Sequence, residues 1–129
     1  MNESTLAIEA MELQGDIALE QSDTASSIAA YQQALQHIDD TGFVSRKIGI
    51  LRKLANVHLD VENFAAVEPL IGIMIEEGET TESLVLRARY AFVKGDNEQA
   101  LALMESAKEA AGEGWSESSE EVLAGYRTD

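Results

Sequence analysis

The chain has 129 residues, about the length of one domain, and 45% of them are apolar while only 5% are aromatic. Its formal net charge is −15, from 24 acidic and 9 basic side chains. Such a surface repels phosphate backbones and anionic lipid, so the sequence argues against nucleic-acid and membrane partners. The same acidity would favour a basic partner, although the simpler reading is that it keeps a small protein soluble.

Cysteine is absent, which excludes a disulfide framework, a thiolate nucleophile and a cysteine-ligated metal. No apolar run approaches the roughly 20 residues of a membrane span. The first residues also lack the basic and then apolar pattern of a secretory signal. We therefore expect a cytoplasmic protein, either complete or one module of a longer chain.

Apolar residues recur at helical spacing along the whole chain, and polar or glycine-containing turns interrupt them. The pattern predicts an all-α fold of about seven helices, at residues 3–21, 24–38, 43–60, 64–77, 81–94, 97–111 and 116–126. Gly42, after the turn residues Asp39 to Thr41, is the expected C-cap of the second helix. Pro69, inside the fourth helix, is expected to kink that helix or to delay its start.

One helix-to-helix turn recurs in the sequence. Gly95 can end a helix with a positive φ, and Asp96 can cap the next helix, with Gln99 three residues on as its capping-box partner. Aligning Asp96 with Asn63 and Asp23 superimposes the flanking residues at separations of 33 and 40 residues. The positions that coincide are Met11, Leu51 and Leu84; Gly15, Ala55 and Ala88; Ser27, Val67 and Ala100; Tyr31, Ile71 and Met104; and Ala34, Met74 and Ala107. A period near 34 with two helices per unit is typical of a helical repeat array.

These residues make the chain resemble the tetratricopeptide repeat family, whose pattern has small residues in both helices, an aromatic in the second, and a Gly-Asp or Gly-Asn turn. The first repeat supplies Gly15, Asp23, Ser27, Tyr31 and Ala34, and the third supplies Ala88, Gly95, Asp96, Ala100, Met104 and Ala107. The second repeat departs from the pattern at Val67 and Met74, and the family's usual proline after each second helix is missing.

The resemblance implies one domain over residues 1–129, an α-solenoid of antiparallel hairpins wound as a right-handed superhelix. Its repeats would span residues 8–41, 48–80 and 81–112, followed by a capping helix at 116–126. That helix carries Val122, Leu123 and Tyr126 on one side, and Trp115 is expected to anchor it against the sixth helix. The structural alternative is an unrelated seven-helix bundle.

In the resembled family, proteins or peptides bind in a concave groove built by the first helix of each repeat. Projected onto this chain, the groove comprises Glu9, Glu12, Asp16, Leu19, Arg52, Asn56, Leu59, Val85, Arg89 and Phe92. Its acidic end would attract a basic segment, and Arg52, Asn56 and Arg89 would orient polar groups or a free carboxylate. The family's carboxylate clamp would need an asparagine where this chain has Leu86, so that match is incomplete. Alternatively, Arg52 and Arg89 pair with the chain's own acids.

No phosphate-binding glycine loop, metal-binding histidine pair or EF-hand loop is present, and we expect no catalytic residue, cofactor or metal. His37 and His58 lie in no motif and are read as surface or packing residues. The sequence therefore predicts a non-enzymatic scaffold or adaptor for protein–protein interaction. The alternatives are a chaperone-like adaptor that holds a client protein, and a structural module that self-assembles into a homo-oligomer.

Overall fold

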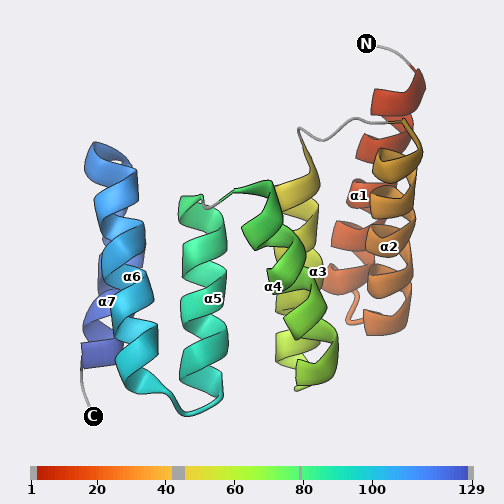
Figure 1. Ribbon diagram of the computed structural model, residues 1–129. Coiled ribbons are helices and arrows are strands. Elements are labelled where there is room, and N and C mark those ends of the chain that lie inside the picture. Colours follow the sequence, from red (N-terminus) through yellow and green to blue (C-terminus); the bar gives the residue numbers. More distant parts are fainter. Residues whose placement is uncertain (1–2, 42–45, 79, 128–129) are drawn as a thin grey trace. The chain divides into compact units, whose positions relative to one another are not determined.

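The structure is a computed structural model, which describes residues 3–41, 46–78 and 80–127. Those residues form only helices and turns, so the predicted all-α class is confirmed (Figure 1). The helices are α1 (Glu3–Glu20), α2 (Thr24–Thr41), α3 (Lys47–Asp60), α4 (Phe64–Glu77), α5 (Thr81–Val93), α6 (Asn97–Ala111), the 3₁₀ turn η2 (Gly112–Gly114) and α7 (Glu117–Arg127). Within the described ranges, no helix is both long and apolar enough to cross a membrane.

Within the described residues, helical periodicity located the helix ends to within a residue, with one difference. The helix α2 continues to Thr41, whereas the sequence placed a turn at Asp39 to Thr41. The prediction stopped at Ile38 because it is the last apolar residue, but a solvent-exposed turn of helix can continue on polar residues, here with Gln36 donating to Asp40 at 3.1 Å. The predicted cap at Gly42 and the predicted helix start at 43 lie outside the described residues.

Pro69 does not delay the start of α4, contrary to one of the two expected effects. The helix already begins at Phe64 and runs through the proline to Glu77. Close to this proline the chain divides into two compact units, Met1–Leu70 and Ile71–Asp129. A single repeat domain over residues 1–129 stays a prediction, and each unit is described by itself below.

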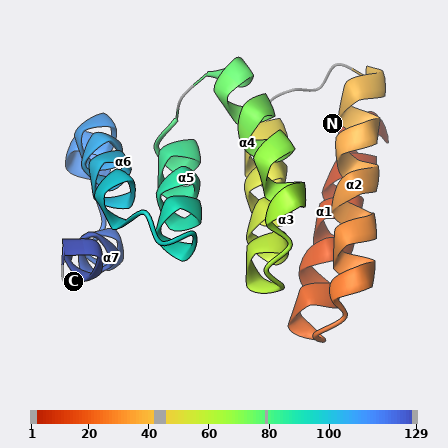
Figure 2. The same ribbon diagram turned by 60° about the horizontal axis from the view of Figure 1, so that its bottom comes forward.

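In the first unit, α1 and α2 form an antiparallel hairpin, and α3 packs against α2 (Figures 1 and 2). The buried core comprises Ile8, Tyr31, Ala34, Ile38, Ile50, Leu54 and Val57, with Met11, Ile28, Leu35 and Leu70 packed around it. Each helix contributes residues three or four apart, which lie on one helical face. Burial of these faces against one another holds the unit together.

In the second unit, α5 and α6 form a second antiparallel hairpin, and α7 packs against α6 (Figure 2). Its core contains Ala88, Met104 and Leu123, surrounded by Val85, Leu101, Leu103, Trp115 and Tyr126. Capping hydrogen bonds mark the N-terminal ends of both helices of this hairpin. Thr80 and Ser83 form a reciprocal capping box at the start of α5, and Asp96 accepts from the backbone N–H of Gln99 at 3.1 Å.

The three hairpin turns share one backbone conformation. Ser22, Glu62 and Gly95 have φ values of 60°, 58° and 91°. In each turn the next residue donates its backbone N–H to the carbonyl five positions earlier: Asp23 to Ala18 at 2.8 Å, Asn63 to His58 at 2.8 Å and Asp96 to Ala91 at 2.9 Å. This is the 6→1 hydrogen bond of a Schellman motif. The turns therefore repeat in the register of 40 and 33 residues found in the sequence.

Burial follows the same register. The small first-helix positions Gly15, Ala55 and Ala88 are all buried, as are Ser27, Val67 and Ala100 one helix later. At Gly15 a hydrogen bond also joins the two helices, since Ser27 Oγ donates to the Gly15 carbonyl at 2.9 Å. Small side chains at these positions let the two helices of a hairpin approach closely. Val67 of α4 is bulkier, and it is also fully buried.

Candidate partner-binding surface

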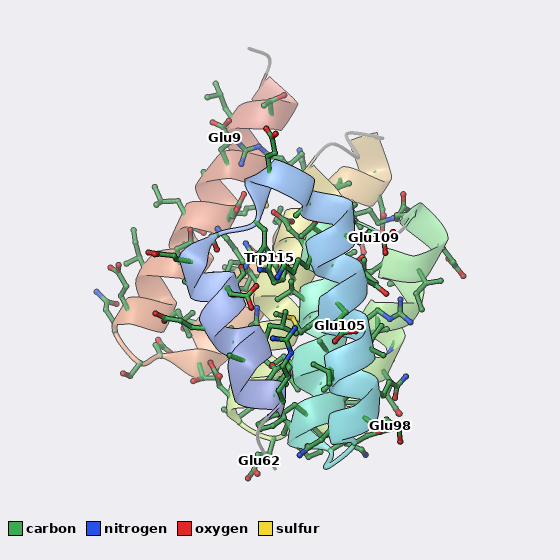
Figure 3. All side chains as sticks on the ribbon, turned by 90° about the vertical axis from the view of Figure 1, so that its left-hand side faces the viewer. Glu9, Glu62, Glu98, Glu105, Glu109 and Trp115 are labelled. Carbon is green, nitrogen blue, oxygen red and sulfur yellow. The ribbon has the colours of Figure 1, made fainter. Side chains whose placement is uncertain are left out.

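Three acidic residues of α1 form an ion-pair cluster with a cation of α3 and with the residue that precedes α3. Arg46 contacts Glu9 at 2.9 Å and Glu12 at 2.8 Å, and Lys53 contacts Glu12 at 2.6 Å and Asp16 at 3.0 Å. Figure 3 labels Glu9 on the ribbon of α1. These three carboxylates are therefore engaged by two cations of the same unit, which weakens the attraction for a basic segment that the sequence predicted.

Asp16 also accepts a hydrogen bond from the Tyr31 hydroxyl at 2.5 Å. Burial of the ring and this hydrogen bond both raise the pKa of Tyr31 above its usual value. For Lys53, burial alone would lower the pKa, but the hydrogen bonds and charges of Glu12 and Asp16 outweigh it and raise the pKa. The cluster thus holds α1, α2 and α3 together through Asp16.

On α3, Arg52 and Asn56 lie four residues apart on one face, and both side chains are partly buried. Leu59, expected on the groove floor, exposes only 3% of its surface, whereas Leu19 in the equivalent position of α1 exposes 40%. Leu19 can therefore contact a partner, and Leu59 offers little surface for one. The first unit brings Glu9, Glu12 and Asp16 together through Arg46 and Lys53.

On α5, Val85, Arg89 and Phe92 follow one another at helical spacing on a single face. The ring of Phe92 stacks on Tyr126 of α7, with centroids 4.6 Å apart and planes inclined by 20°. Burial raises the pKa of Tyr126, and the nearby positive charge of Arg89 opposes this effect. Tyr126 therefore joins the predicted surface of α5, although the sequence assigned it only to the capping helix.

The helix α7 is attached to α6 as predicted. Trp115 packs against the core residues Met104 and Leu123 and donates from Nε1 to Glu120 at 3.1 Å (Figure 3). Lys108 of α6 contacts the same carboxylate at 2.6 Å and is the main cause of its lowered pKa. Val122, predicted on the covered side, is instead 43% exposed, because Leu123 occupies the buried position.

The sequence missed Arg46, Lys53 and Tyr126. The two cations lie 34 to 41 residues from their acidic partners, so no local spacing pairs them. The repeat itself could have indicated these ion pairs. If the first helices of successive repeats lie side by side, residues about one period apart in the sequence come together. The α1 and α3 residues belong to one unit and the α5 residues to the other, so a groove continuous over all ten residues stays a prediction.

In the part of the chain that the structure describes, no three His, Asp or Glu side chains are placed to hold a metal ion. His58 is 7% exposed, burial lowers its pKa, and Asn63 Nδ2 lies 3.4 Å from its Nδ1. Among the described residues, Leu84, Ser106, Glu109 and Ala110 line an open hollow between α5 and α6.

No family model matches the sequence, and no curated protein matches it. The likeness to the tetratricopeptide repeat therefore depends on the residues and turns described above.

Proposed function

We propose that this protein is a non-enzymatic scaffold of three tetratricopeptide-like hairpins that binds a segment of another protein. The observation that carries the proposal is the recurrence of one turn, with the same positive φ and the same 6→1 hydrogen bond, at Ser22, Glu62 and Gly95. Repeated hairpins of this kind present equivalent helix faces to a partner. A cytoplasmic location, as expected from the sequence, is part of the proposal.

The partner would contact the first-helix face of each unit. In the first unit this face offers Leu19 for apolar contact and Arg52 and Asn56 for polar groups. In the second unit it offers Arg89 beside the stacked pair of Phe92 and Tyr126. Guanidinium groups pair bidentately with carboxylates, and aromatic rings supply large apolar contact area.

This combination favours a partner segment with a carboxylate next to apolar side chains over a purely basic segment. The reason is that Arg46 and Lys53 already engage Glu9, Glu12 and Asp16. A basic partner would have to compete with these two cations.

The test is affinity capture from a lysate of the source organism with two matched double variants. Arg52→Glu with Arg89→Glu should lose the partner that the wild-type protein retains. The control, Lys94→Glu with Arg127→Glu, changes the charge by the same amount at exposed residues outside the surface and should retain the partner. Circular dichroism must show that both variants are folded. Equal capture by both variants would refute the assigned surface.

A further inference from the structure

The helix α7 covers part of the surface to which the partner is proposed to bind. Its residue Tyr126 stacks on Phe92 of α5, with ring centroids 4.6 Å apart. Phe92 is one of the predicted contact residues, and 40% of its surface stays exposed beside the stacked ring. A partner can therefore reach the covered face of the Phe92 ring only if α7 moves.

Only a small part of α7 is buried. Within Glu117–Arg127, Leu123 is the single buried residue, whereas α5 and α6 bury five and three residues. A helix of 11 residues is marginally stable by itself in water, so α7 depends on its contacts with α5 and α6. The ion pair between Lys108 and Glu120 lies at the surface, where such pairs contribute little. A competing segment therefore has few contacts to replace.

The connection between α6 and α7 is suited to a change of direction. Gly112 has a φ of 55° and a ψ of −123°, which residues with a side chain rarely adopt, and Gly114 follows two residues later. An added Cβ at either glycine would meet no atom within 4 Å, so neither is enclosed by packing. Rotation about these glycines would move α7 away and leave the hairpin of α5 and α6 in place.

The contacts of α7 show which chemistry this surface accepts. Glu120 contacts Lys108 of α6 at 2.6 Å, Leu123 joins the core of the unit, and Tyr126 stacks on Phe92. The three α7 residues follow one another at intervals of three, on one side of the helix. They combine a carboxylate with apolar side chains, which is the combination favoured above for the partner.

We propose that α7 is an internal occupant of the second unit's binding surface and that the partner displaces it. The partner segment is an amphipathic helix with a carboxylate, a leucine and an aromatic residue at successive intervals of three residues. This inference rests on the proposed function and specifies its partner. The stacked pair of Phe92 and Tyr126 is then the closed form of the surface.

The test titrates the full-length protein with a labelled peptide of residues 116–127, which is α7 without Trp115. The wild type should bind it weakly, because its own α7 is tethered to the site at a high effective concentration. Tyr126→Ala should bind it at least about tenfold more tightly, because the tethered helix loses one of its contacts. Val122→Ala, at a 43% exposed residue of the same helix, is the matched control and should bind as the wild type does. Circular dichroism verifies that each variant is folded.

Trp115, the only tryptophan of the chain, reports the movement of α7 directly (Figure 3). It packs with Leu123 and donates to Glu120, so displacement of α7 by the peptide should shift its emission to longer wavelength. Equal affinity of Tyr126→Ala and Val122→Ala, or binding without this shift, would overturn the proposal. Light scattering that shows a wild-type dimer, dissociated by the peptide, would also overturn it by assigning the surface to α7 of a second copy.

Affinity capture separates this inference from the proposed function. The variant Arg52→Glu with Arg89→Glu tests whether the partner uses the predicted surface at all. If it does, Tyr126→Ala should capture more of the same partner than Val122→Ala. Equal or smaller capture by Tyr126→Ala would refute displacement of α7 and leave the predicted surface in place.

Discussion

Gly15 of α1 lies directly against the ring of Tyr31 of α2, so closely that a methyl group at Gly15 would overlap the ring. A Cβ built on Gly15 would lie 2.6 Å from Tyr31 Cδ1 and 2.8 Å from Cζ. Ser27 supports the same approach by its buried hydrogen bond to the Gly15 carbonyl. The glycine is therefore required by packing between two helices, although it is a poor helix former.

Replacing this glycine should destabilise the protein even though alanine favours helix. Gly15→Ala must displace Tyr31, at an expected cost of about 1–3 kcal/mol in the free energy of unfolding. Gly49→Ala is the matched control in α3, since a Cβ there meets no atom within 4 Å, and it should stabilise by about 0.5–1 kcal/mol. Urea unfolding measures both. A stabilising Gly15→Ala would contradict the close approach of α1 and α2.

The turns make a second prediction, because two of them place an ordinary residue where glycine is favoured. Ser22→Gly and Glu62→Gly should each raise the free energy of unfolding by roughly 0.5–1 kcal/mol, since left-handed backbone is costly for other residues. Gly95→Ala should lower it by about 1 kcal/mol. If Ser22→Gly or Glu62→Gly were destabilising in thermal melts, the shared turn conformation would be wrong.

The hydroxyl of Tyr31 couples α2 to the ion-pair cluster on α1. Tyr31→Phe should lower the free energy of unfolding by about 1.5–3 kcal/mol, because it removes a hydrogen bond to a charged acceptor. A double-mutant cycle with Asp16→Asn isolates this contact from the remaining interactions of Asp16 with Lys53. The two substitutions should be non-additive. Strict additivity would mean that the hydroxyl does not bond Asp16 in solution.

His58 should make stability depend on pH below neutrality. Burial lowers the pKa of His58 in the folded state, so the unfolded chain, with a histidine pKa of about 6.5, binds the proton more readily. The contribution of neutral His58 is therefore fully present above pH 6.5 and is lost as the pH falls below it. Urea unfolding between pH 7.5 and 5.5 measures this loss.

One variant separates His58 from the many acidic groups. His58→Gln should flatten the decline in stability over this range. A decline that is the same in the wild type and in His58→Gln would exclude the histidine as its source.

The helices and turns could be predicted from the sequence because both depend on local chemistry. Apolar spacing marks the helical faces, and aligning Gly95 with Ser22 and Glu62 located turns that lack glycine. The predicted end of α2 at Ile38 was wrong, because a helix can continue on polar residues beyond its last apolar residue. Local pattern therefore reveals which residues face the core, but it overlooks solvent-exposed helix termini.

The candidate surface was less predictable because its properties depend on packing between helices. The pairing of Glu12 with Lys53 joins residues 41 positions apart, and the stacking of Phe92 on Tyr126 joins α5 to α7. Register alone placed Leu19 and Leu59 in equivalent positions, yet one is 40% exposed and the other 3%. Neighbouring side chains, which the repeat alignment does not specify, make this difference.

Site-specific photo-crosslinking tests most directly whether the first-helix faces bind the partner. A photoreactive residue would replace Asn56 of α3 or Val85 of α5, and in matched proteins the exposed Gln33 of α2 or Glu105 of α6 (Figure 3). After irradiation in lysate, one shared partner should be cross-linked from Asn56 and Val85, and none from Gln33 or Glu105. Cross-linking of a partner from Gln33 or Glu105, without any from Asn56 or Val85, would contradict the proposed binding surface.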